Sequence, residues 1–188
     1  MNHKFFNNDT KAIKNIILLG ILFIFLMACL FHFLYVATGK TLISAVLFPT
    51  NESIFEHLKL LLYPTIVYWL IAYIVSSKDY NIDSCKWLIC CITSSILSII
   101  FVLSWHYILK GAFNFSSTIT DILSVLIATT VGQLVSLHIY KYLKCTKVKL
   151  LISILVLVCI IILFTYLTFK PIELPLFLDS TTGLYGIK

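Results

Sequence analysis

The sequence predicts an all-α integral membrane protein, a bundle of about five transmembrane helices, from three observations. Of its 188 residues, 60% are hydrophobic and only 12% are charged, and the mean hydropathy is +1.01. Soluble domains carry about one quarter charged residues. Five apolar runs approach the roughly 20 residues that a bilayer requires, and short polar segments separate them. We therefore expect a single membrane domain over residues 1–188.

The elements follow from the apolar runs in chain order. The expected spans are 14–36, 53–76, 87–109, 119–140 and 149–169. The first run is too long for the hydrophobic part of a cleaved signal peptide, so we interpret it as a retained span. Residues 41–50, TLISAVLFPT, are apolar but too few to cross, which favours a re-entrant or interfacial segment. In the fourth span, Ala128, Gly132 and Ser136 follow the spacing of closely packed membrane helices.

The distribution of lysine predicts the orientation. The chain has fourteen lysines and no arginine, and its net charge is +6. A cytoplasmic N-terminus puts nine lysines inside and four outside, with Lys59 inside a helix. Cytoplasmic loops carry the positive excess, so we expect the N-terminus inside and the C-terminus outside a cell membrane. Because this asymmetry accounts for the charge, and arginine's planar fork for phosphate is absent, we expect no nucleic-acid partner.

Ionisable residues gather at the predicted outer end of the bundle. The stretch TNESIFEHLKLLLYP, residues 50–64, opens the second span with four of them. Charged groups within spans normally face the bundle interior or a wet cavity. We therefore expect a shared, water-accessible pocket lined by Glu52, Glu56, His57, Lys59, His106 and Asp121.

One function compatible with these residue types is metal-assisted hydrolysis. Catalytic zinc takes about three His or carboxylate ligands and an activated water, with a further carboxylate as base. In this hypothesis the zinc ligands are His57, His106 and Asp121, and the catalytic side chains are Glu56, Glu52 and Lys59, with Glu56 as the base. Glu52 is an alternative ligand to Asp121. The chain contains no HExxH motif, so the signal is weak.

Two other functions fit the same residues. A transporter or small-molecule-binding protein would use Glu52, Glu56 and Lys59 as a binding or proton-relay group. A non-catalytic membrane or assembly protein would use them only to finish a helix end. In that case Ser53 and Glu56 form a capping box, and Glu56 and Lys59 form an i,i+3 pair. The sequence slightly favours the non-catalytic role, with a protein partner or homo-oligomer left open.

The six cysteines carry little functional signal. Cys85, Cys90, Cys91 and Cys145 lie at or near the predicted cytoplasmic side, where thiols are kept reduced. Their spacing matches no zinc motif. We therefore expect small buried hydrophobic residues and no structural disulfide.

The C-terminal stretch FKPIELPLFLDSTTGLYGIK is too short and too broken to span a membrane. Its leucines and Phe177 require cover, unlike the polar residues of a disordered terminus. We expect this tail, residues 170–188, to fold back over the outer end and to cap the site near Asp179.

Two blocks carry a resemblance to a known family. FPTNESIFEHLKLLLYP and PLFLDSTTGLYGI resemble the N-E-S-x-x-E-H-x-K and D-x-x-x-G-x-Y-G-I patterns of small membrane proteins from Firmicutes-type bacteria. That family is classed as a domain of unknown function. The resemblance extends over most of the chain, from the first helix to the last residue. It implies a bacterial membrane location and a multi-helix fold, and it implies no particular chemistry.

Overall fold

The structure is a helical bundle with five membrane-length helices, as the sequence predicted. A computed structural model describes the backbone of residues 2–115 and 117–187, and side chains from residue 9 onwards. Its helices are α1 (Asn2–Ala37), α2 (Leu42–Leu47), α3 (Ile54–Ser76), α4 (Ser84–Phe113), α5 (Thr118–Tyr142), α6 (Lys147–Phe169) and the 3₁₀ turn η1 (Pro175–Phe177). All except α2 and η1 are long and apolar enough to cross a membrane, α1 from Asp9 onwards.

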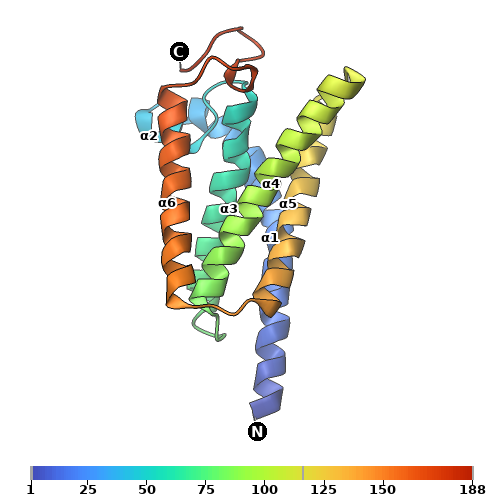
Figure 1. Ribbon diagram of the computed structural model, residues 1–188, viewed down its shortest axis with the longest axis vertical. Helices are drawn as coiled ribbons and strands as arrows, with labels where there is room; N and C mark the ends of the chain where they lie inside the picture. Colours follow the sequence, from blue (N-terminus) through green and yellow to red (C-terminus); the bar gives the residue numbers. More distant parts are fainter. Residues whose placement is uncertain (1, 116, 188) are drawn as a thin grey trace.

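The two ends of the bundle differ in what they carry. Helix α2, the start of α3 and the C-terminal tail lie at one end, which we call the tail end, and the N-terminus lies at the other (Figure 1). Helix α4 extends beyond the predicted span at both ends because polar caps continue it. Asp83 caps its first turn, and Asn114 closes its last turn in the left-handed conformation.

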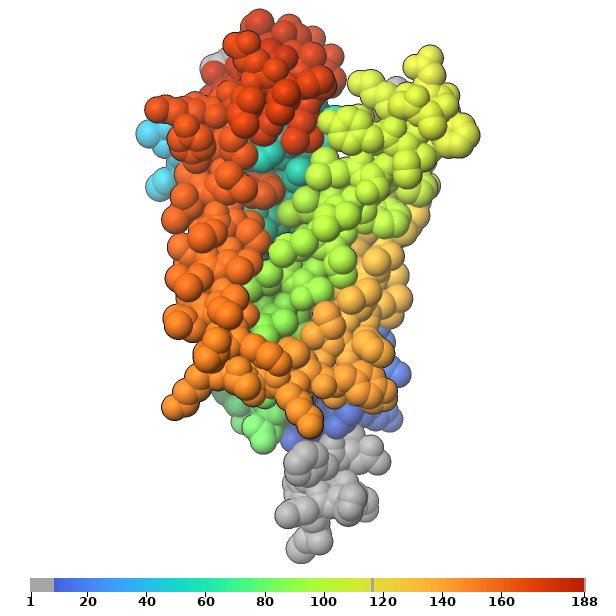
Figure 2. All heavy atoms as spheres, viewed as in Figure 1, coloured from blue at the N-terminus to red at the C-terminus, as the bar shows by residue number. Residues whose placement is uncertain are grey.

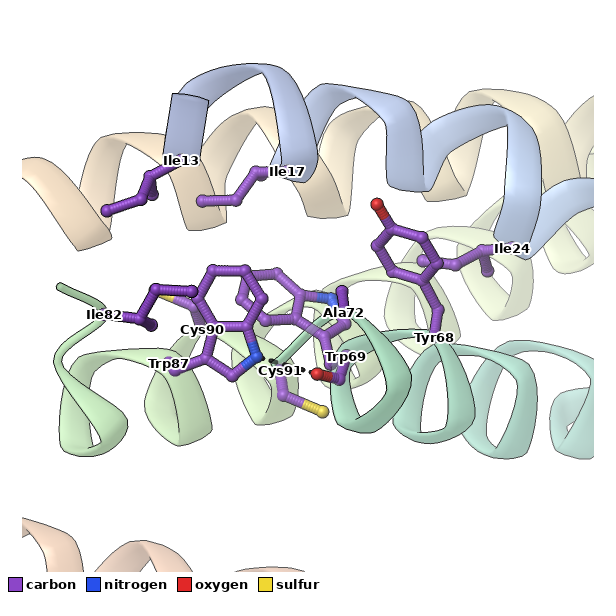
Figure 3. Packing of buried hydrophobic residues seen from close by; sticks show 10 residues of the cluster. All are labelled: Ile13, Ile17, Ile24, Tyr68, Trp69, Ala72, Ile82, Trp87, Cys90 and Cys91. Carbon is purple, nitrogen blue, oxygen red and sulfur yellow. Dashed lines mark hydrogen bonds between the residues drawn. The ribbon is translucent and has the colours of Figure 1, made fainter. Parts of the chain in front are cut away.

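The helices α1, α3, α4 and α5 form the packed centre, whereas α6 stands at its side (Figure 1). More than half of the apolar window of α3 is buried, and almost none of that of α6. Toward the N-terminal end, the Trp69 and Trp87 rings pack edge to face with centroids 4.6 Å apart. The indole N–H of Trp87 also donates to the carbonyl of Trp69 (Figure 3).

The small-residue row of α5 makes the predicted close helix contact. A Cβ added to Gly132 would lie 2.6 Å from the Ser98 Oγ and 2.8 Å from the Ser94 carbonyl oxygen, both on α4. The hydroxyl of Ser136 donates to the Cys90 carbonyl on the same neighbouring helix. Only a residue without a side chain allows the two backbones to approach this closely, which confirms the prediction for Gly132.

The tail folds back over the bundle, as expected. Phe177 is buried against Phe55 of α3, with ring centroids 4.6 Å apart. The side chain of Asn51 donates to the Gly186 carbonyl, and Ser180 donates to the Glu52 carbonyl. In the space-filling view, the tail covers the ends of α6 and α3 (Figure 2). Its leucines are less covered than predicted, since Leu174 and Leu184 remain half exposed.

The prediction that no disulfide forms is wrong for one pair of cysteines. Cys85 at the start of α4 and Cys145 in the α5–α6 connection are bonded, with Cα atoms 6.1 Å apart. Sequence spacing could not show this pairing, because 60 residues separate the two and only the fold brings the connections together. Cys90 and Cys91 are buried free thiols, as predicted, and Cys29 and Cys159 are free but exposed.

Candidate functional site

The ionisable residues of the stretch 50–59 separate into two groups at the tail end, one of which also includes His32 of α1. One group, which we call the His–Glu cluster, contains His32 of α1, Glu52 of the turn before α3, and His57 of α3. The other, which we call the buried pair, contains Glu56 and Lys59. The shared pocket expected from the sequence is therefore divided by the helix itself.

Three side-chain atoms converge in the His–Glu cluster. The Nε2 atoms of His32 and His57 lie 3.1 Å apart. The Glu52 Oε2 atom is 3.3 Å from the His57 Nε2 and 3.9 Å from the His32 Nε2. All three side chains are partly exposed, with Glu52 the most accessible at 46%. Such a convergence of lone-pair atoms needs a shared proton or a metal ion between them.

The tautomer of His57 follows from its other ring nitrogen. The Nδ1 atom lies 2.8 Å from the Ser53 carbonyl oxygen. Because a carbonyl oxygen only accepts, Nδ1 must carry the proton and donate it. In the neutral ring, Nε2 is then a lone pair directed at Glu52 and His32, and in the protonated ring Nε2 donates to the Glu52 carboxylate. A backbone carbonyl that fixes the ring in this way is the usual support of a metal-binding histidine.

Glu52 is held by the turn rather than by the helix. Ser53 is the N-cap of α3, so the helix begins one residue after it and Glu52 lies outside the helix. The backbone N–H of Ser53 donates to the Asn51 Oδ1, which tightens the turn. When the His57 ring is protonated, its Nε2–H donates to the carboxylate and lowers the pKa of Glu52 below its ordinary value, and partial burial opposes this only in part. Glu52 is thus a carboxylate at neutral pH.

The buried pair has a structural environment. Lys59 is fully buried, and its Nζ lies 2.7 Å from the Glu56 Oε2. The same ammonium group donates to the carbonyl of Ala45, at the C-terminal end of α2, at 2.7 Å. Glu56 also accepts from the backbone and hydroxyl of Thr50 and from the hydroxyl of Thr168 on α6. The pair therefore joins α2, α3 and α6.

The capping-box prediction is correct in one half and wrong in the other. The Ser53 Oγ accepts from the Glu56 N–H, which is the expected N-cap. The Glu56 carboxylate does not return to the Ser53 N–H, which donates to Asn51 instead. Lys59 and Thr50 offer the carboxylate stronger and more numerous donors. The predicted i,i+3 pairing of Glu56 with Lys59 is confirmed.

His106 and Asp121 lie at the tail end but are not members of the His–Glu cluster. His106 lies near the end of α4, and its ring interacts electrostatically with Lys110 first and then with Asp121 and His57. Its Nε2 atom is buried and has no hydrogen-bond partner among the described residues. Asp121 is exposed in the first turn of α5. The structure therefore brings together His57 and Glu52 from the predicted set, and places His106 and Asp121 beyond them.

Sequence reasoning did not include His32 among the site residues. A signal existed, because His32 is an ionisable residue near the tail end of the first span, five residues before α1 ends. His57 lies three residues after α3 begins. At about 1.5 Å per residue, the two are within a few ångströms of the same depth on antiparallel helices.

The tail places a further carboxylate near this end. Asp179 is buried, and its two carboxylate oxygens accept from Thr181 and Thr182. Desolvation raises the pKa of Asp179, but these hydrogen bonds outweigh it and bring the value to about 2. The left-handed backbone at Gly183 closes this turn. Asp179 therefore stabilises the tail, as its own donors account for both oxygens.

Comparison with known proteins identifies a family and no activity. A family model described as a family of unknown function, DUF6512, matches residues 1–187, and the chain belongs to this family. No curated protein and no solved structure matches the chain.

Proposed function

We propose that this DUF6512 protein binds a divalent transition metal ion, with zinc as the best candidate, through the His–Glu cluster. The observation that carries the proposal is the spacing of the three ligand atoms. Zinc bonds of about 2.0–2.1 Å in a tetrahedron put neighbouring ligand atoms about 3.3 Å apart. The observed separations of 3.1, 3.3 and 3.9 Å lie close to that value.

The chemistry of the ligands supports the same ion. Imidazole nitrogens suit zinc and neighbouring transition metals, whereas magnesium and calcium prefer oxygen alone. The Ser53 carbonyl fixes the His57 ring with Nε2 available, and Glu52 supplies a negative charge. Both histidines come from helices and Glu52 from a capped turn, so little ordering is needed on binding.

We place binding ahead of hydrolysis because two of the predicted catalytic side chains, Glu56 and Lys59, are enclosed. Glu56, the residue expected to act as general base, is 2% exposed and engaged by Lys59, Thr50 and Thr168. A base that must exchange protons with a metal-bound water needs access that this position lacks. Lys59 is equally enclosed.

Hydrolysis is a second candidate because of one observation. Catalytic zinc sites keep three protein ligands and leave a position for water. The His–Glu cluster offers three ligands whose side chains are about one third to one half exposed. On this hypothesis Asp121 and His106 are the remaining candidates for the proton-transferring group.

The location is also part of the proposal. We infer a bacterial cell membrane with the tail end outside, supported by the lysine asymmetry and by the two sequence blocks. Reporter fusions after Lys86, Lys149 and Lys188 should report inside, inside and outside. An outside signal at Lys149 or an inside signal at Lys188 contradicts this orientation.

Metal analysis of the purified protein tests the binding proposal. Protein without a polyhistidine tag is incubated with excess zinc, dialysed and measured by inductively coupled plasma mass spectrometry. We expect about one zinc per chain, lost in His32→Ala and in His57→Ala. His138→Ala is the matched control and should retain zinc. His138 lies in the last two turns of α5, at the end of the bundle opposite the tail end.

Two results decide between ligand sets. Retention of zinc in both His32→Ala and His57→Ala, or no zinc in the parent protein, refutes the proposed site. Loss of zinc in His106→Ala and Asp121→Asn but not in His32→Ala would favour the ligand set predicted from the sequence. Full retention in those two variants favours the His–Glu cluster.

A further inference from the structure

A second chemically distinct feature lies at the N-terminal end, away from the His–Glu cluster. Cys85 is the second residue of α4, and Cys145 directly precedes Thr146, the N-cap of α6. Their bond joins the first turn of α4 to the α5–α6 connection. The Cα separation of 6.1 Å is within the ordinary range for a disulfide, so the backbone holds the two sulfurs together.

The surroundings favour the thiolate form of both residues when the bond is open. Cys85 lies in the first turn of α4, where unpaired N–H groups stabilise a negative charge and oppose the effect of its burial, and Cys145 lies one residue before the N-cap of α6. Lys86 follows Cys85, and Lys144 and Lys147 flank Cys145. Asp83 opposes this effect, since its carboxylate lies within 4.8 Å of both sulfurs. One of its oxygens already accepts from the Lys86 N–H.

Accessibility assigns different roles to the two sulfurs. Cys85 is 8% exposed, whereas Cys145 is partly exposed in its connection. An external disulfide therefore reaches Cys145 first. Cys85 is placed to attack the mixed disulfide that forms at Cys145. This division into an accessible attacking thiol and a shielded resolving thiol is typical of redox-active pairs.

We propose that Cys85 and Cys145 form a redox-active pair that exchanges with low-molecular-weight disulfides and thiols of the cytoplasm. The inference rests on the orientation proposed above, and it is independent of metal binding. A cytoplasmic disulfide is kept open by the thiol pool unless it is part of a redox cycle. In the closed state, the bond fastens the start of α6, the least enclosed of the spans, to α4.

The exchange balances in two steps. The Cys145 thiolate attacks a disulfide RSSR, forms the mixed disulfide Cys145–S–SR and releases one thiolate RS⁻. The Cys85 thiolate then attacks the Cys145 sulfur, closes the protein bond and releases the second RS⁻. The two cysteines lose two electrons, and RSSR gains them. Reduction by two RSH runs the same steps in reverse.

Equilibration with glutathione tests the proposal. The full-length protein in detergent micelles is held at graded ratios of reduced to oxidised glutathione, quenched with acid and labelled with polyethylene-glycol maleimide. We expect two thiols to appear and disappear together across these ratios in the native protein. Cys91→Ser, which removes a buried unpaired thiol, should show the same transition. Cys145→Ser should abolish it.

The single variants separate the two roles. Cys85→Ser should accumulate a glutathione mixed disulfide at Cys145, several-fold faster than Cys145→Ser does at Cys85. A bond that opens only after denaturation, or two thiols that never oxidise together, overturns the proposal.

Sidedness is measured with a membrane-impermeant maleimide on reduced protein. The reagent should label Cys145 in inverted vesicles and not in intact cells. This labelling is identified by its loss in Cys145→Ser. Labelling from outside the cell overturns the cytoplasmic redox couple through its orientation, whereas a resistant bond overturns the exchange itself. Neither result affects the zinc measurement.

Discussion

The buried pair and, apart from His32, the His–Glu cluster come from the same stretch of ten residues but occupy opposite environments. Glu56 and Lys59 are enclosed, and their charged groups make six hydrogen bonds, two with Thr50 and one each with Thr168, Ala45, Phe48 and each other. Glu52 and His57 remain partly exposed, and among the described residues the hydrogen bonds and ion pairs of their side chains involve each other, His32 and the Ser53 carbonyl. The difference teaches that residue type alone does not identify a site. Charged groups whose hydrogen bonds are all made within the protein stabilise the fold. Lone pairs that converge without donors are suited to bind a metal ion.

The largest expected effect comes from breaking the buried pair. Lys59→Met leaves the Glu56 carboxylate enclosed without its cation, which should lower the free energy of unfolding by about 3–5 kcal/mol. Unfolding in mixed micelles measures this change. The double variant Glu56→Gln/Lys59→Met should recover much of the loss. A single variant as stable as the parent would show that water reaches the pair.

Zinc should distinguish the two regions. At about 100 times the dissociation constant, zinc should raise the free energy of unfolding by about 2.7 kcal/mol, because it binds only the folded chain. His57→Ala should lose this increment, and Lys59→Met should keep it despite its lower stability. Thermal unfolding with and without zinc measures both. If zinc stabilised His57→Ala as much as the parent protein, the two regions would not differ in metal binding.

A packing change remote from both regions sharpens the comparison. Gly132→Ala puts a methyl group against Ser98 and the backbone of Ser94, and should cost about 1–3 kcal/mol without loss of zinc. Gly111→Ala on α4 is the matched control, because a Cβ there meets no atom within 4 Å. Scanning calorimetry and metal analysis of both variants check this. Zinc loss in Gly132→Ala would mean that the cluster depends on bundle packing.

The smallest effect concerns the tail and pH. Folding lowers the pKa of Asp179 from 3.8 to about 2, so its stabilisation is complete above pH 3.8 and is lost as the pH falls toward 2. We expect about 1 kcal/mol, since solvent screening reduces the full value of ~1.4 kcal/mol per pKa unit. Unfolding measured from pH 5 to 2 should show this loss in the parent and not in Asp179→Asn. If the free energy of unfolding fell equally with pH in the parent and in Asp179→Asn, other carboxylates would account for the acid sensitivity.

Most of the fold could be predicted from the sequence, because membrane spans are encoded by local apolar length. The tail end could also be predicted, since Phe177 and the leucines around it required cover. The close contact of Gly132 followed from a spacing within one helix. Orientation stays a prediction that reporter fusions will decide.

The site was only partly predictable because its partners are distant in sequence. Glu56 pairs with Lys59 three residues away, which spacing predicts, but also with Thr168, which it does not. His32 meets His57 across 25 residues, and the meeting depends on how two helices are rotated. The disulfide was missed for a different reason. The reducing cytoplasm was taken to exclude any disulfide, but the fold brings Cys85 and Cys145 together.

The position of the His–Glu cluster in the chain has a consequence for biosynthesis. Its three side chains all belong to the first 57 residues, so the ribosome has made them before the third span is synthesised. The hairpin of α1 and α3 is enough to bring them together. A metal ion bound at that stage would cross-link the two helices before the later spans are made. Glu56 can contact Thr168 only after the last span is made, whereas its partner Lys59 lies in the same helix. Nascent chains stalled after α3 should therefore already contain the complete ligand set.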